Sequence, residues 1–163
     1  MKTSHHFVTT FFLLVFLTSC ASIPKPTETI QPTQVVIPTD LAFSTALVQV
    51  LSQSGLSIMS VQSSTYMAMF PSTDKAAWIK TNEGIVEVIF FADPSEVEQI
   101  HITEQPDKTA GRYLYMIQAP PPTLSHDQTI DAAYPLYFTV KNDMLMITSS
   151  AELDKTLKHI FSG

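Results

Sequence analysis

Residues 78–91 read WIKTNEGIVEVIFF, and this stretch decides the fold. Two runs rich in β-branched and aromatic residues, Trp78–Thr81 and Ile85–Phe91, flank the polar turn Asn82-Glu83-Gly84. Runs of this composition around a short turn with Asn and Gly, which tolerate positive φ, are typical of a β-hairpin. The sequence therefore predicts an antiparallel strand pair, and with it a sheet on which the rest of the domain packs.

Helix signals stand on both sides of this hairpin. Before it, apolar residues recur at helical spacing over 41–54, with Asp40 as the expected cap and Gly55 as the expected end. After it, Asp93-Pro94-Ser95-Glu96 combines a capping Asp, a Pro at the first helical position and a Glu at the third. This second signal predicts a helix that continues to about Ile102.

A second hairpin and a helix are expected near the end of the sequence. Leu136–Val140 and Met144–Thr148 are expected to pair around the turn Lys141-Asn142-Asp143. A serine at position 149 or 150 then caps a helix that extends through Phe161, with apolar residues along one face.

These elements follow the same order twice. The first unit covers residues 40–91, with a strand at Leu56–Gln62, and the second covers 94–148, with a strand at Arg112–Gln118. Hairpins give antiparallel sheets, and amphipathic helices bury their apolar stripe against a sheet face. We therefore expect an α+β fold: a mainly antiparallel sheet built from two helix-strand-hairpin units, with the helices on one face and a C-terminal helix.

The N-terminus has the layout of a bacterial secretion signal. Lys2 is followed by an apolar run from Phe11 to Leu17 and then by Thr18-Ser19-Cys20. The run is shorter than the roughly 20 apolar residues that a permanent transmembrane helix needs. Two interpretations are open: an ordinary signal peptide, or a lipoprotein signal in which Cys20 is modified.

Leu17-Thr18-Ser19-Cys20 resembles the lipobox of bacterial lipoproteins, which is an aliphatic residue, two small residues and a cysteine. The resemblance implies cleavage between Ser19 and Cys20, and a diacylglyceryl group on the Cys20 thiol. Cys20 is the only cysteine of the sequence, so it has no partner for an internal disulfide. The chain is thus expected at a cell membrane, lipid-anchored on the extracytoplasmic face; whether the membrane is an inner or an outer one is left open.

Composition sets the remaining boundaries. We expect residues 1–19 to be a lipoprotein signal peptide, 20–39 the lipidated cysteine and a Pro/Thr-rich tether, and 40–163 a single α+β domain.

The net charge of the chain is negative. Loss of Lys2 with the signal lowers the number of basic residues from 9 to 8 against 15 acidic residues, so the net charge falls from −6 to −7. No run of basic residues exists, and an acidic chain of this kind is not expected to bind nucleic acid.

The domain also resembles small, uncharacterised bacterial lipoproteins. Phe70, Asn82-Glu83-Gly84 and Phe90-Phe91-Ala92-Asp93 carry the likeness, and Leu136–Phe161 is similar as well. Those proteins have Pro-His-Phe before the last hairpin, where this chain has Tyr134-Pro135-Leu136-Tyr137. Any site that uses that histidine is therefore absent here, and the resemblance implies no activity.

Catalytic and metal motifs are sparse. Ser125-His126-Asp127 has the residue types of a catalytic triad, but triad members converge from separate elements, so a polar turn is the better interpretation. His101 and Glu104 would share a helix face, yet two ligands without a partner motif do not predict a metal site. We expect no enzyme activity, no metal and no cofactor.

Two methionine pairs could either pack in the hydrophobic core or bind copper. Met67 with Met69, and Met144 with Met146, place thioethers on one side of a strand, and thioethers are ligands that Cu(I) prefers. The strand at Met144–Thr148 is apolar on both faces, however, which is typical of a strand buried on both sides. Core packing is the favoured interpretation.

The sequence thus predicts a membrane-anchored lipoprotein that binds a partner, such as an envelope protein, without catalysis. Aromatic and Met side chains are common at interfaces, so Tyr66 and Phe70, within Tyr66-Met67-Ala68-Met69-Phe70, are the candidate interaction surface. The same residues could instead fold back on the core. The alternative function is a carrier of a small ligand or of copper, and a hydrolase that uses His126 ranks third.

Overall fold

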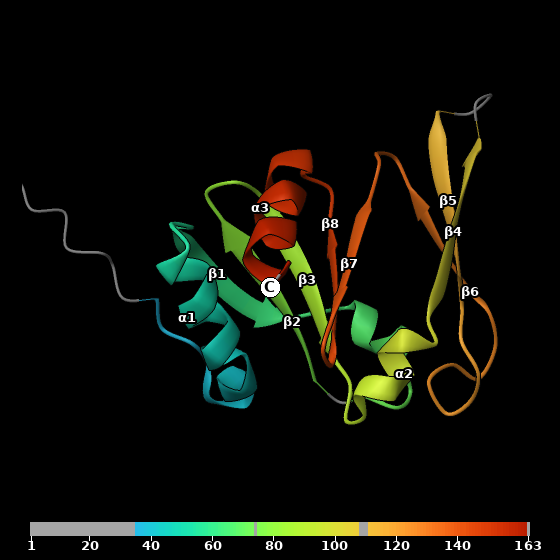
Figure 1. Ribbon diagram of the computed structural model, residues 1–163, viewed down its shortest axis with the longest axis horizontal. Coiled ribbons are helices and arrows are strands. Elements are labelled where there is room, and N and C mark those ends of the chain that lie inside the picture. Colours follow the sequence, from blue (N-terminus) through green and yellow to red (C-terminus); the bar gives the residue numbers. More distant parts are fainter. Residues whose placement is uncertain (1–34, 74, 108–110, 163) are drawn as a thin grey trace, which may run out of the picture. The chain divides into compact units, whose positions relative to one another are not determined.

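The computed structural model describes residues 35–73, 75–107 and 111–162. The expected signal peptide, the Ser19–Cys20 cleavage site and most of the tether lie outside these residues. Within them, no helix combines the length and the hydropathy that crossing a membrane needs. In chain order the elements are η1 (Thr39–Ser44), α1 (Thr45–Gln53), β1 (Ile58–Ser63), η2 (Tyr66–Met69), β2 (Lys75–Thr81), β3 (Ile85–Phe90), α2 (Pro94–Glu98), β4 (His101–Asp107), β5 (Arg112–Gln118), β6 (Gln128–Ala132), β7 (Tyr137–Lys141), β8 (Met144–Thr148) and α3 (Ala151–Phe161), where η marks a 3-10 helix (Figure 1).

The strands form two antiparallel sheets. One sheet has the order β1-β2-β3-β8-β7 and the other the order β4-β5-β6. Both predicted hairpins are present, as β2–β3 and β7–β8, and β8 pairs with β3 to join them in a single sheet. The prediction of an α+β fold with mainly antiparallel sheet and a C-terminal helix is confirmed.

The five-stranded sheet separates two apolar cores. Side chains alternate along β3, so Val86 and Val88 belong to one core while Ile89 belongs to the other. α1 and α3 cover the first core, with Leu51 and Leu157. The second core lies against α2 and the three-stranded sheet. All residues of β8 are buried, as expected for a strand with two apolar faces.

The first helix differs from its prediction at the start. Residues 39–44 form the 3-10 helix η1, and Asp40 lies inside it instead of capping it. A 3-10 helix has 3.0 residues per turn against 3.6, so the buried face is displaced. Val48 is buried, while Ala46 and Val50 are exposed. Gly55, at φ +94°, follows the helix as predicted.

The second half departs from the expected repeat. α2 starts as predicted, with the Asp93 side chain accepting a hydrogen bond from the Ser95 N–H at 2.9 Å, but it ends at Glu98. Residues from His101 onward form β4, and the unpredicted strand β6 pairs on the other edge of β5. These strands make a separate sheet, so the two halves do not repeat one another and the helices do not all share one face.

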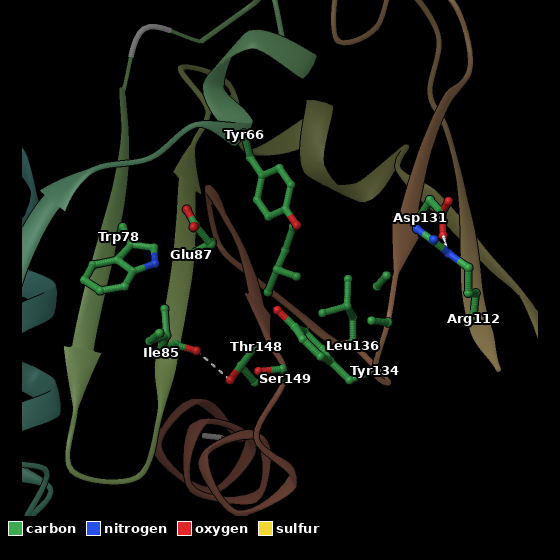
Figure 2. A pocket seen from close by; sticks show the side chains of 13 residues that line it. Tyr66, Trp78, Ile85, Glu87, Arg112, Asp131, Tyr134, Leu136, Thr148 and Ser149 are labelled. Atoms are coloured by element: carbon green, nitrogen blue, oxygen red, sulfur yellow. Dashed lines mark hydrogen bonds and ion pairs between the residues drawn. The ribbon is translucent and has the colours of Figure 1, made fainter.

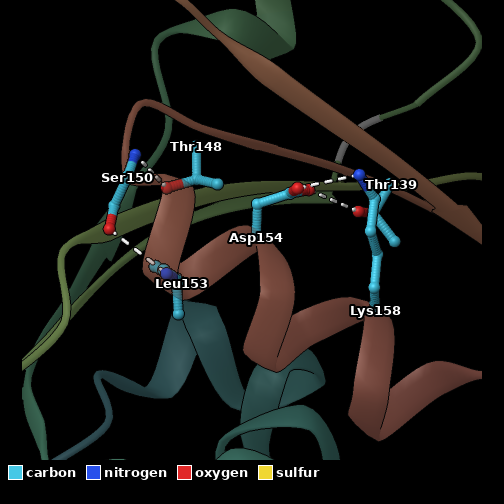
Figure 3. A network of polar contacts seen from close by, with 6 residues as sticks. All are labelled: Thr139, Thr148, Ser150, Leu153, Asp154 and Lys158. Carbon is cyan, nitrogen blue, oxygen red and sulfur yellow. Dashed lines mark hydrogen bonds and ion pairs between the residues drawn. The ribbon is translucent and has the colours of Figure 1, made fainter.

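Polar contacts fix α3 to the five-stranded sheet (Figure 3). Ser150 caps the helix, as expected, by accepting a hydrogen bond from the Leu153 N–H at 3.2 Å. Asp154, buried at the helix–sheet junction, is 2.7 Å from the Lys158 ammonium and accepts a 3.4 Å hydrogen bond from Thr139 on β7. The network fixes the helix on the sheet face that carries the first core.

Candidate functional site

A cleft of about 350 Å³ lies on the sheet face opposite α1 and α3. We call it the inter-sheet cleft, because one wall comes from β2, β3 and β8 and the other from β5, β6 and the segment that follows β6. Its lining residues are Tyr66, Trp78, Ile85, Glu87, Arg112, Asp131, Ala132, Ala133, Tyr134, Leu136, Ile147, Thr148 and Ser149 (Figure 2). Its size is near the lower end for small-molecule pockets, which suits a single side chain or a small ligand.

The strand register builds the floor of the cleft. Trp78 on β2 and Glu87 on β3 are directly opposed, and Ile147 on β8 opposes Glu87 from the other side. Residues opposed across antiparallel strands project from the same face of the sheet. Trp78, Glu87 and Ile147 therefore form one row across the floor.

Tyrosines face one another over this floor. Tyr66 comes from η2, where its backbone N–H donates a 3.1 Å hydrogen bond to the Ser64 hydroxyl. Figure 2 shows Tyr66 and Tyr134 entering from opposite sides, with their hydroxyl ends directed toward the same space. Tyr134 follows β6 and is 57% exposed, so it stands at the mouth of the cleft, while Tyr66 is half-buried.

Glu87 is the unusual group of the cleft. Its side chain is half-buried, and its Oε2 atom is shielded from solvent without a hydrogen-bond partner. Burial raises the pKa of Glu87 above its ordinary value, and a hydrogen bond from Ser64 offsets part of that rise. The pKa of Tyr66 is raised by burial and, in smaller part, by the charge of Glu87 and by Tyr134. The two groups are thus electrostatically coupled.

The rim carries an ion pair. Arg112 Nε lies 2.7 Å from Asp131 Oδ1, and both side chains are about half exposed. An exposed pair of this kind contributes between about 0 and 1 kcal/mol to stability. It neutralises the guanidinium, so the charged lining groups, Glu87, Arg112 and Asp131, sum to one negative charge.

The two residues expected to form an interaction surface separate in the structure. Tyr66 lines the inter-sheet cleft. Phe70 is fully buried in the second core, where its ring meets Phe91 edge-on with centroids 5.4 Å apart. Phe70 is therefore a core residue and not part of a surface, since the turn after η2 folds it back on the sheet.

The other chemically interesting residues do not form sites within the described chain. The His126 ring is hydrogen-bonded to Ser125 and to Gln128, while Asp127 accepts a hydrogen bond from Gln118, so no triad relay exists. His101 and Glu104 lie on the strand β4 and not on a helix. An odd separation on a strand places them on opposite faces. No group of three or more potential metal ligands is found among the described residues.

Met144 and Met146 face the first core and are buried there. Both thioethers belong to the apolar core that side chains of α1 and α3 complete, so core packing explains why these methionines are present. Met69 is a partly buried member of the second core, so the two methionine pairs do not meet at one site.

Sequence reasoning missed Trp78 and Glu87 as functional candidates. A signal was present, because Glu87 interrupts the otherwise apolar run Ile85–Phe91 of a strand that has both faces covered. A carboxylate at such a position is costly unless it is paired or serves a function.

Searches for similar proteins returned no matching family model, curated protein or solved structure for this chain.

Proposed function

We propose that this chain is a membrane-tethered binding module, anchored through lipid on Cys20 on the extracytoplasmic face, whose inter-sheet cleft receives a partner. The observation that carries the proposal is the half-buried Glu87 carboxylate on a cleft floor that is otherwise largely aromatic and aliphatic. Clefts that combine apolar walls with a few placed polar groups are typical binding sites. The proposed anchor would keep this cleft at a membrane surface.

Binding without catalysis is favoured by the groups that the cleft contains. Its hydroxyls belong to two tyrosines, Thr148 and Ser149, and the Thr148 hydroxyl donates a 2.7 Å hydrogen bond to the Ile85 carbonyl. No histidine, cysteine or lysine lines the described cleft, so it lacks the usual base for activating a hydroxyl nucleophile. A carboxylate among aromatic rings suits recognition better than bond cleavage.

Site-specific photocrosslinking in cells tests the proposal. A photoreactive phenylalanine analogue replaces Tyr134 at the mouth of the cleft in the full-length protein. The matched control carries the analogue at Met59 on β1, which is 60% exposed and outside the cleft lining. Intact mass measurement after irradiation detects protein and small-molecule adducts alike. We expect a defined adduct at position 134 that Tyr66→Ala diminishes.

Equal labelling at positions 134 and 59 would contradict a role for the cleft. So would an adduct at position 134 that is unchanged by Tyr66→Ala, because the ligand would then touch only the outer surface. Membrane fractionation of the same cells tests the anchor separately. A protein that binds its ligand but is absent from the membrane fraction would contradict the lipid anchor and leave the binding function in place.

A further inference from the structure

Glu87 has no cationic partner within the described residues. Arg112–Asp131, Lys155–Glu152 and Lys158–Asp154 are ion pairs of the described residues, and none of these three involves Glu87. Arg112 lines the same cleft, but its guanidinium is bound to Asp131 at the rim. A half-buried carboxylate without a counter-ion is costly, so the position indicates a ligand that supplies the missing positive charge.

The surroundings of Glu87 define the chemistry of that ligand. The charged groups of the lining sum to one negative charge, which is complementary to a monocation. Tyr66, Trp78 and Tyr134 bring aromatic rings to the same cleft, and aromatic rings attract cations and pack on alkyl chains. A volume of about 350 Å³ admits a short alkyl chain.

The type of cation follows from the hydrogen-bonding groups. Glu87 Oε2 is an acceptor without a donor, and the tyrosine hydroxyls can also accept. A primary ammonium offers three N–H donors at a point charge, whereas a quaternary ammonium offers none. We propose, on the basis of the binding function above, that the inter-sheet cleft binds a primary alkylammonium group, with Glu87 as its ion partner and the aromatic side chains around its alkyl stem.

Two sources present this chemistry: the side chain of a lysine in a partner protein, and a free alkylamine. A lysine enters with its backbone outside the mouth, near Tyr134, and a free amine has no such extension. The two sources are separated by comparing n-butylammonium with Nα-acetyl-lysine methylamide, which carries the same butylammonium stem on a backbone.

The only tryptophan of the sequence gives a direct readout. Because Trp78 lines the cleft, its fluorescence reports occupancy of this site without a label. The purified full-length protein in detergent is titrated with n-butylammonium, with 1-pentanol as an uncharged analogue of similar length and with tetramethylammonium as a cation without donors. We expect saturable binding of butylammonium, and binding of the other two at least about tenfold weaker.

Glu87→Gln keeps the shape of the side chain and removes its charge. We expect this variant to bind butylammonium about tenfold more weakly and 1-pentanol unchanged. Glu96→Gln on α2, which is outside the cleft lining, is the matched control and should bind like wild type. Thermal melting of both variants confirms that they fold. A tighter complex with the lysine derivative supports a protein ligand, and a weaker one supports a free amine.

Acidification supplies a second readout. Ser64, Tyr66, Trp78 and Ile147 lie around Glu87, and the ion pair Arg112–Asp131 lines the rim of the same cleft. Lowering the pH from 7 protonates Glu87, because burial raises the pKa of its carboxyl group. Butylammonium keeps its charge in this range, and its affinity should fall as Glu87 is protonated. The Gln variant should show no such fall.

Equal binding of butylammonium and 1-pentanol, or full butylammonium affinity in Glu87→Gln, would overturn the ammonium proposal and leave a cleft that binds by shape. Absence of any change in Trp78 emission also overturns it. Photocrosslinking at position 134 then decides whether the binding function survives: an adduct there retains the function with another ligand, and none rejects both.

Discussion

Trp78 and Glu87 are directly opposed on β2 and β3, and both project from the sheet face that lines the inter-sheet cleft. Their neighbours on the same strands, Ala77 and Val88, face the opposite, fully buried core. An apolar residue in place of Glu87 would satisfy packing on this face equally well. The carboxylate therefore costs stability on this face, as expected if it serves the proposed binding function.

Replacement of Glu87 by Gln should change how stability depends on pH. The folded state holds the pKa of Glu87 above its ordinary value near 4.5, which applies in the unfolded chain. Glu87 therefore costs stability as pH rises from about 4.5 through the folded pKa, and has no such effect below that window. We expect Glu87→Gln to raise the free energy of unfolding at pH 7 by no more than about 1 kcal/mol, because a half-exposed group is screened by solvent.

The measurement is denaturant unfolding of wild type and variant at pH 4 and pH 7. The difference between the two proteins should be larger at pH 7 than at pH 4. A constant difference would mean that burial does not penalise the charge, and the reading of Glu87 as an uncompensated carboxylate would then fail.

Phe70 and Tyr66 should respond very differently to truncation. Phe70 is fully buried and packs edge-on against Phe91, so Phe70→Ala should cost about 3–5 kcal/mol of folding stability. Tyr66 is half-buried at the cleft, so Tyr66→Ala should cost less than about half of that while reducing adduct formation at position 134. Chemical denaturation measures both, and equal losses would place Tyr66 in the core with Phe70.

Gly84 should not tolerate a side chain. It adopts φ +145°, and a Cβ added there would lie 2.8 Å from the Cβ of Ser150, the cap of α3. Gly84→Ala should therefore destabilise the fold by about 1–3 kcal/mol through strain and displacement of the cap. Gly55→Ala is a useful comparison, because Gly55 also has positive φ but meets no atom within 4 Å. A smaller melting-temperature loss for Gly55→Ala would separate the clash from the backbone strain.

Local patterns made part of this fold predictable. The hairpin β2–β3 and the helix α3 were predicted because each is specified by its own residues: a turn ending in Gly84, and the cap Ser150 before an apolar stripe. The sheet order was not predictable in the same way. β8 pairs with β3 although more than 50 residues of chain separate them, and no local sequence pattern indicates which distant strand is the partner.

The second sheet was missed because its outer strands carry weak patterns. β4 has polar residues at most positions, with Ile102 partly buried, and β6 has Ile130 and Ala132 as its buried residues. The cleft was missed for a related reason, because Glu87 and Tyr134 come together only when the two sheets are placed side by side. Tyr66 alone was identified, from its residue type.

The Asp154–Lys158 pair should contribute more stability than a surface pair of similar spacing. Asp154 is buried, whereas Glu152 and Lys155, on the same helix, are both about three-quarters exposed. Lys158→Gln should cost about 1–2 kcal/mol because it leaves a buried carboxylate, and Lys155→Gln should cost less than about 0.5 kcal/mol. Double-mutant cycles with Asp154→Asn and Glu152→Gln measure the two couplings. Equal couplings would show that solvent screens Asp154 as well.

The proposed anchor rests on Cys20 alone, so one substitution tests it. Cys20→Ala removes the only thiol of the chain, and the variant should incorporate no labelled palmitate and should keep residues 1–19. Each buried CH₂ of an acyl chain contributes roughly 0.8 kcal/mol to membrane binding, so loss of the chains should also release the domain from the tightly bound membrane fraction, apart from what the uncleaved apolar run retains. Ala21→Ser is the control and should be lipidated like wild type. If labelled palmitate still enters Cys20→Ala, the lipid is attached elsewhere, and the cleft must reach its ligand by another route.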